Sequence, residues 1–128
     1  MGWRERTHDE TYTDAEVEER LKAELPHWYL ENGWIRRKIK TSGWKATLMV
    51  VNTIGHLAEK AWHHPDLSVS YAFVIVKLVS HAEKGITEKD LQLARKIEDV
   101  VFWDAATTAP GILEGTPDDP RFKYIKPD

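Results

Sequence analysis

Cysteine is absent from this chain of 128 residues, which excludes disulfide bonds, thiol nucleophiles and cysteine-ligated metal ions. Long apolar runs are absent too: none approaches the roughly 20 residues that a membrane-spanning helix needs. The first residues lack the apolar core of a signal peptide. With a formal net charge of −3, the chain has no general attraction to nucleic acid or to an anionic membrane. We therefore expect a cytoplasmic protein that has neither of them as a partner.

What the chain does contain suits one compact domain. Apolar residues make up 41% of it and charged residues 30%, the balance of a packed core with a solvated surface. We expect a loose N-terminal segment at residues 1–12, a folded domain at residues 13–103 and a C-terminal tail at residues 104–128. Four large apolar residues would let the tail pack on the domain or across a subunit interface: Ile112, Leu113, Phe122 and Tyr124.

The first half of the chain predicts one helix and a hairpin. Thr13 and Glu16 have the spacing of a capping box, in which two side chains satisfy free backbone N–H groups at a helix start. Pro26 ends that helix. Asn32-Gly33 is a strong hairpin signal, because both residues tolerate positive φ. The strands that it joins are expected at residues 28–30 and 34–40.

The second half predicts a helix, a strand region and a last helix. Pro65 ends the first of these helices, and Thr87 caps the last, which runs to residue 101. Residues 70–81 are strand-like and apolar on both faces. The sequence leaves open whether a separate short strand precedes them near residues 67–71. The predicted fold is α+β, with three helices on one face of a small antiparallel sheet of about four strands, in the order α-β-β-α-β-β-α. Alternating steps of four and three predict one face of a long helix of about five turns: Trp44, Leu48, Val51, Gly55, Ala58 and Trp62.

The chemistry of the sequence is concentrated around His63-His64-Pro65. Histidine is the side chain whose ordinary pKa lies nearest neutral pH, and a third histidine, His81, closes the strand region. Glu59 precedes His63 by four residues, a spacing at which helical side chains can meet. If they meet, the Glu59 carboxylate would orient the His63 imidazole. The alternative is an ordinary solvated pair of side chains on the helix surface.

Two other interpretations of the histidines stay open. A single histidine after a helix often serves only to interact with the helix C-terminus. A metal site is the second alternative, since His56, Glu59 and His63 share helical spacing and the three histidines His63, His64 and His81 could cluster. No standard zinc motif such as H-E-x-x-H is present.

The spaced set of Glu59, His63-His64-Pro65, Tyr71, His81 and Asp90 resembles the core pattern of the pterin-4a-carbinolamine dehydratase family. The strand-turn-helix segment from Val74 to Ala94 and the early strand pair near Trp28 are also similar to the family. The resemblance spans roughly residues 15 to 101. Trp62 stands where some members carry an acidic residue, and the tail after Phe102 is longer than the family's minimal domain.

The resemblance implies a hydro-lyase that dehydrates 4a-hydroxytetrahydropterin to the quinonoid dihydropterin in tetrahydrobiopterin recycling, without a metal or redox cofactor. His63 and His81 would be its acid–base pair, with His64 holding the substrate and Glu59 tuning His63. Neutral-range groups suit such proton transfers. The pterin would be bound by four further residues: Trp28, Pro65, Tyr71 and Asp90.

The resemblance also implies partners and an alternative. Family members are generally dimers or tetramers, so a homo-oligomer is expected, and an aromatic amino acid hydroxylase would supply the carbinolamine. Some relatives act instead as non-catalytic dimerisation or assembly cofactors on the same fold. A fold alone does not decide between these functions.

Overall fold

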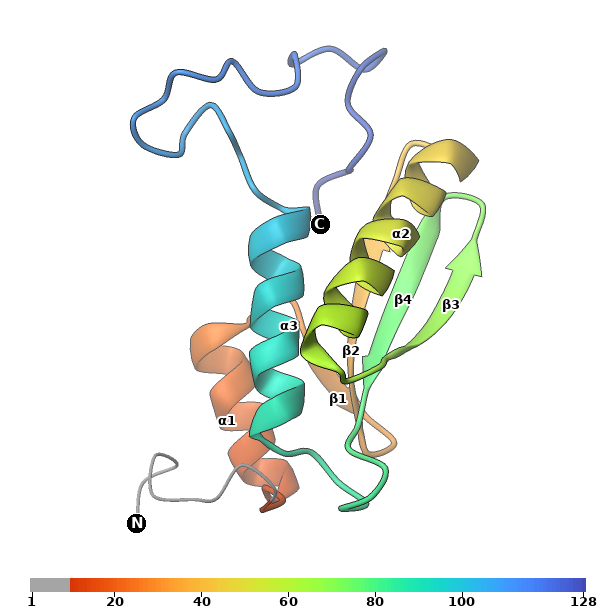
Figure 1. Ribbon diagram of the computed structural model, residues 1–128, viewed down its shortest axis with the longest axis vertical. Helices are drawn as coiled ribbons and strands as arrows, with labels where there is room; N and C mark the ends of the chain where they lie inside the picture. The colour runs from red at the N-terminus through yellow and green to blue at the C-terminus, as the bar shows by residue number, and fades with distance from the viewer. Residues whose placement is uncertain (1–9) are drawn as a thin grey trace.

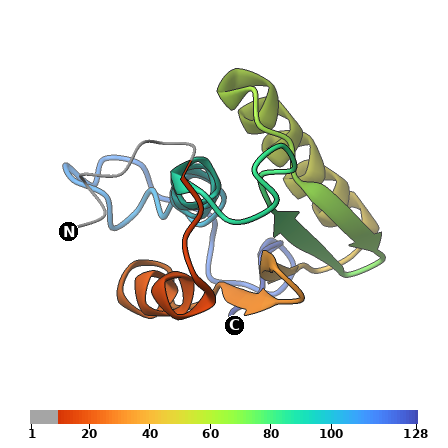
Figure 2. The same cartoon turned by 90° about the horizontal axis from the view of Figure 1, so that it is seen from below.

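A computed structural model describes residues 10–128 as one layer of helices on a four-stranded antiparallel sheet (Figure 1). The strands lie in the order β1-β2-β4-β3. Two views at right angles place α3 between α1 and α2 (Figures 1 and 2). The element order predicted from the sequence is confirmed. The bounds are α1 Asp14–Glu24, β1 Tyr29–Glu31, β2 Trp34–Lys40, α2 Trp44–Ala61, β3 Asp66–Ser70, β4 Phe73–Leu78 and α3 Glu88–Val101.

α1 begins with the capping box that the sequence predicts, and α3 begins at the predicted cap, Thr87, with a second box. At α1 the Thr13 hydroxyl accepts from the Glu16 N–H (3.2 Å), and the Glu16 carboxylate accepts from the Thr13 N–H (2.9 Å). Thr87 and Asp90 repeat this arrangement at α3. Each box satisfies backbone donors that a helix start leaves free. Among residues 10–128, no helix is both long and apolar enough to cross a membrane.

The strands follow the turn signals. Asn32 and Gly33 have φ of 51° and 79°, the positive values that a two-residue hairpin turn requires, and Glu31 pairs with Trp34 across it. The apolar region predicted as strand from residue 70 to 81 is two elements. β3 ends at Ser70, β4 begins at Phe73, and the two pair antiparallel. The core side of β4, formed by Val74, Val76 and Leu78, is fully buried.

The apolar face predicted for α2 is buried only in part. Ala58 is buried and Val51 half-buried, but Trp44 is 50% exposed and Trp62 77%, and Leu48 is exposed too. The residues that the helix buries lie mostly beside that stripe: Ala46, Thr47, Val50, Ile54 and Ala58. Apolar residues occur on both faces of α2, so periodicity alone could not decide which face meets the sheet.

The N-terminal end of the described chain differs from expectation, and the tail docks on the domain through other groups than the four expected. Tyr12, which the sequence placed in a loose segment, is buried, and its N–H donates to the Ile86 carbonyl (2.8 Å); residues 1–9 of that segment lie outside the described part. The tail arcs away from α3 and returns to the sheet (Figure 1). It docks through its backbone, the Lys126 N–H donating to the Lys40 carbonyl (2.9 Å), and through half-buried Ile125. The side chains expected to hold it are exposed: Ile112, Leu113, Phe122 and Tyr124.

Candidate active site

The paired histidines lie in the connection between α2 and β3. Trp62, which caps the C-terminus of α2, has a left-handed backbone (φ 53°, ψ 45°). Its N–H donates to the carbonyls of Ala58 and Glu59, so the chain leaves the helix direction at this residue. His63 and His64 follow outside the helix, and half-buried Pro65 leads directly into β3.

His63 is joined to α3 by a buried carboxylate. Its Nε2 lies 2.6 Å from Asp90 Oδ1, and the Asp90 side chain is fully buried. The other carboxylate oxygen accepts from the Ser80 hydroxyl (2.8 Å) and the Thr87 N–H (2.9 Å). A buried carboxylate with both oxygens bonded has one orientation available, so it holds the imidazole in place. Asp90 is thus both a capping residue and the partner of His63.

Glu59 is bonded to His64, not to His63 as the sequence predicted. Its Oε2 lies 2.6 Å from His64 Nε2, and both side chains are more than half exposed. The prediction assumed that α2 continues through His63, which would put residues four apart on one face. The left-handed turn at Trp62 breaks that spacing and carries His64 to Glu59 instead.

His81 is connected to this cluster through its neighbour in the chain, Ser80. It follows Ser80, whose hydroxyl contacts Asp90, and its exposed ring packs edge-on against Trp34 at 5.4 Å between centroids. The Ser80 backbone pairs with Gly85, which fixes the start of the turn that carries His81. Within residues 10–128, no three histidine or acidic side chains group closely enough to hold a metal ion.

Trp28 and Tyr71 lie away from the histidines in this chain. Trp28 is buried, lines a cavity of about 340 Å³ between α1 and β1, and donates from Nε1 to Glu98 (2.8 Å). Glu98 is eight residues, about 12 Å, beyond Asp90 along α3. Tyr71 is exposed in the β3–β4 turn beside Gly43, which precedes the opposite end of α2 from His63.

Ser80 is a residue of the candidate site that the sequence patterns did not single out, although one signal for it was visible. Its Oγ lies 2.8 Å from Thr87 Oγ1 as well as from Asp90, and it is buried. A serine at the end of an apolar strand, directly before a candidate histidine, needs a polar partner when buried. That requirement points to the nearby cap of the next helix.

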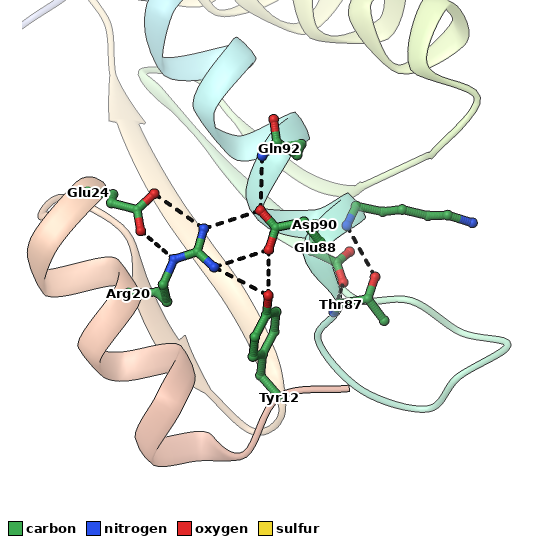
Figure 3. A network of polar contacts seen from close by, with 8 residues as sticks. Tyr12, Arg20, Glu24, Thr87, Glu88, Asp90 and Gln92 are labelled. Carbon is green, nitrogen blue, oxygen red and sulfur yellow. Dashed lines mark hydrogen bonds and ion pairs between the residues drawn. The ribbon is translucent and has the colours of Figure 1, made fainter. Parts of the chain in front are cut away.

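A second polar network holds the start of α3 against α1 (Figure 3). The guanidinium of Arg20 donates to both oxygens of Glu88 (3.1 and 3.2 Å), and the Tyr12 hydroxyl donates to Glu88 as well (2.6 Å). Burial opposes ionisation of Glu88, but the hydrogen bonds from Arg20, Tyr12 and Gln92 outweigh it and lower its pKa. Burial, with Glu88 beside it, raises the pKa of Tyr12 to about 12. The network therefore anchors the helical turn that contains Asp90.

Known proteins are similar to this chain in sequence and in fold. A protein of Aquifex aeolicus assigned as a pterin-4-alpha-carbinolamine dehydratase is 46% identical over 87 residues, which cover 66% of this chain and 88% of that protein. A protein of Chloroflexus aurantiacus with the same assignment is 38% identical over 89 residues, 70% of this chain and 95% of its own. The crystal structure of a transcriptional coactivator/pterin dehydratase from Brucella melitensis is similar with a TM-score of 0.64 and 32% identity, covering 70% of this chain and 96% of that one.

The comparisons cover the part of the chain that carries the histidines and their partners. The model of the family described as pterin 4 alpha carbinolamine dehydratase matches residues 10–100. That range contains all seven elements apart from the last residue of α3. This chain therefore belongs to the pterin 4 alpha carbinolamine dehydratase family and is an enzyme of the hydro-lyase class.

Proposed function

We propose that this chain dehydrates 4a-hydroxytetrahydropterin to quinonoid dihydropterin by histidine general acid–base catalysis, as a step of tetrahydrobiopterin recycling. The observation that carries the proposal is the 2.6 Å contact between His63 and the fully buried Asp90. A fixed imidazole beside a solvent-reachable surface is the arrangement that proton transfer to or from a bound substrate requires.

The reaction needs one proton delivered and one removed. A proton added to the 4a-hydroxyl group lets it leave as water. Loss of a proton from the neighbouring ring nitrogen leaves an electron pair that forms the new carbon–nitrogen double bond. The dehydration transfers no electrons to or from an outside reagent, so the step requires no redox cofactor.

The proposed residue roles are those that the family resemblance implies, and the contacts of His63 and His64 support them. His63, held by Asp90, and the exposed His81 are the proposed acid–base pair. His64 is proposed to hold the substrate, and its contact with Glu59 orients it from the solvent side. Pro65 fixes the direction of the chain after the two histidines, since its ring restricts the residue before it.

The chain is also proposed to work as a homo-oligomer. The outer face of α2 exposes Trp44, Leu48 and Met49, and a contiguous apolar face of this kind is uncommon on a monomer. A second copy of the chain would cover it. An aromatic amino acid hydroxylase is the proposed source of the carbinolamine, because that class of enzyme leaves its pterin hydroxylated at position 4a.

A second candidate function is a non-catalytic role as a dimerisation or assembly cofactor. The similar protein of Brucella melitensis is described as a transcriptional coactivator as well as a pterin dehydratase, which favours keeping this alternative. The two functions make different demands on the histidines, because assembly does not need protonatable side chains at the exposed site.

A dehydration assay with synthetic 4a-carbinolamine tests the proposal. Removing a general acid or base typically lowers turnover about 10²–10⁴-fold, so His63→Ala and His81→Ala should each lower it and the double variant should be slower than either. His56→Ala is the matched control, since His56 is an exposed histidine on α2. If the wild-type chain dehydrates the carbinolamine no faster than buffer alone, the assembly role is favoured.

A further inference from the structure

Trp62 has a backbone conformation that its side chain does not favour. Its φ of 53° and ψ of 45° are left-handed, a region in which a bulky residue is a genuine outlier and in which glycine is usual at a helix end. Such conformations persist where the surrounding structure or the function demands them. The fold alone would be served better by glycine at this position.

Packing does not account for the tryptophan either. The residue is 77% exposed, so its indole contributes little to the apolar core. Its ring contact is with His64, edge-to-face, with 5.0 Å between the ring centroids and 81° between the planes. A large apolar ring is thereby kept in solvent directly beside a proposed substrate-binding histidine.

We propose that Trp62 is a substrate-contact residue whose indole stacks on the flat bicyclic ring of the pterin at the mouth of the histidine site. This inference rests on the proposed function. Aromatic side chains stack on flat heterocycles with offset faces. An indole 5.0 Å from the His64 ring is close enough for both rings to contact one ligand of two fused six-membered rings.

The left-handed backbone explains how the indole reaches that position. A right-handed residue at 62 would continue α2 and present its side chain along the helix surface, in line with Trp44 and Leu48 on the outer face. The left-handed turn instead redirects the chain and leaves the indole over His64. The same turn separates His63, which faces Asp90, from His64, which faces Glu59.

The test compares Trp62→Gly with Trp62→Phe and with Trp103→Ala, a control that removes another exposed tryptophan, just beyond the end of α3. The probe is 7,8-dihydrobiopterin, a stable relative of the product, with binding measured by calorimetry alongside KM and kcat for the carbinolamine. Stacking of one ring is worth about 5- to 150-fold in affinity, so Trp62→Gly should raise Kd and KM by that factor with kcat little changed. Trp62→Phe should restore most of the affinity, and Trp103→Ala should leave the affinity unchanged.

Melting temperature and mass complete the experiment. Because glycine suits the left-handed region, Trp62→Gly should melt about 2–5 °C above wild type, so weaker pterin binding cannot be attributed to unfolding. Unchanged affinity in Trp62→Gly would overturn the inference and leave the proposed function standing. Weaker affinity accompanied by a smaller mass in light scattering would also overturn it, by assigning the indole to a subunit contact. A wild-type chain that binds no pterin would overturn both.

Discussion

Replacing Asp90 separates its two tasks, holding His63 and capping α3. The carboxylate is fully buried and accepts from the Ser80 hydroxyl and the Thr87 N–H while contacting His63. Asp90→Ala removes all three contacts at once. Asp90→Asn keeps one oxygen for the cap but replaces the other with an NH₂ group, which cannot accept a hydrogen bond from the imidazole.

The expected magnitudes follow from those contacts. In Asp90→Ala two buried donors lose their acceptor, and each unsatisfied donor costs about 1–3 kcal/mol. The Ser80 hydroxyl can turn to Thr87 Oγ1, 2.8 Å away, so we expect a loss of about 2–4 kcal/mol in the free energy of unfolding. Asp90→Asn should lose about 1–2 kcal/mol. It should also lower turnover about 10²-fold, at the low end of the general acid–base range because His63 itself remains.

Urea unfolding and the dehydration assay measure the two effects on the same preparations. Asp99→Asn, an exposed aspartate on the same helix, is the matched control and should match wild type in both. A folded Asp90→Asn protein with wild-type turnover would show that the carboxylate does not position a reacting imidazole. An Asp90→Ala protein as stable as wild type would refute the argument that the buried donors of Ser80 and Thr87 need this acceptor.

Three further predictions concern the rest of the molecule. The pKa of Glu88 is lower in the folded chain than its ordinary value. Its ion pair with Arg20 therefore stabilises the fold fully when the pH is above the ordinary pKa, and this stabilisation is lost as the pH falls through the lower pKa of the folded chain. Glu88→Gln should lower stability to urea at neutral pH and match wild type in strongly acidic buffer. Deleting residues 104–128 should lower the melting temperature or change the oligomer, and unchanged values of both would show that the tail covers nothing important. Trp44→Lys combined with Leu48→Lys should reduce the mass seen by light scattering, and an unchanged mass would place the subunit contact elsewhere.

Local signals in the sequence predicted the ends of elements well. The capping box at Thr13 and the cap at Thr87 form as predicted, and Asn32-Gly33 makes the hairpin turn. These signals depend on neighbours within about four residues, so tertiary structure has little scope to override them. The element order and the α+β class followed from them.

The failures at α2 and at the candidate site concern direction in space. The buried face of α2 could not be chosen because that helix has apolar residues on both sides, and the partner of Glu59 depended on the left-handed backbone of Trp62. Periodicity assumes a regular helix and says nothing of its last residue. The contact of Asp90 with His63 joins positions 27 residues apart, which no local pattern encodes.

The site has a consequence for how the chain acquires activity. His63 follows α2, Ser80 follows β4 and Asp90 lies in α3, so the three meet only after the sheet has paired and α3 has docked on it. Contacts between distant segments form late, because the chain between them must first lose its freedom. During refolding, helical circular dichroism should therefore return before dehydratase turnover. A compact state with native helices but loose packing would contain every proposed catalytic side chain and still be inactive.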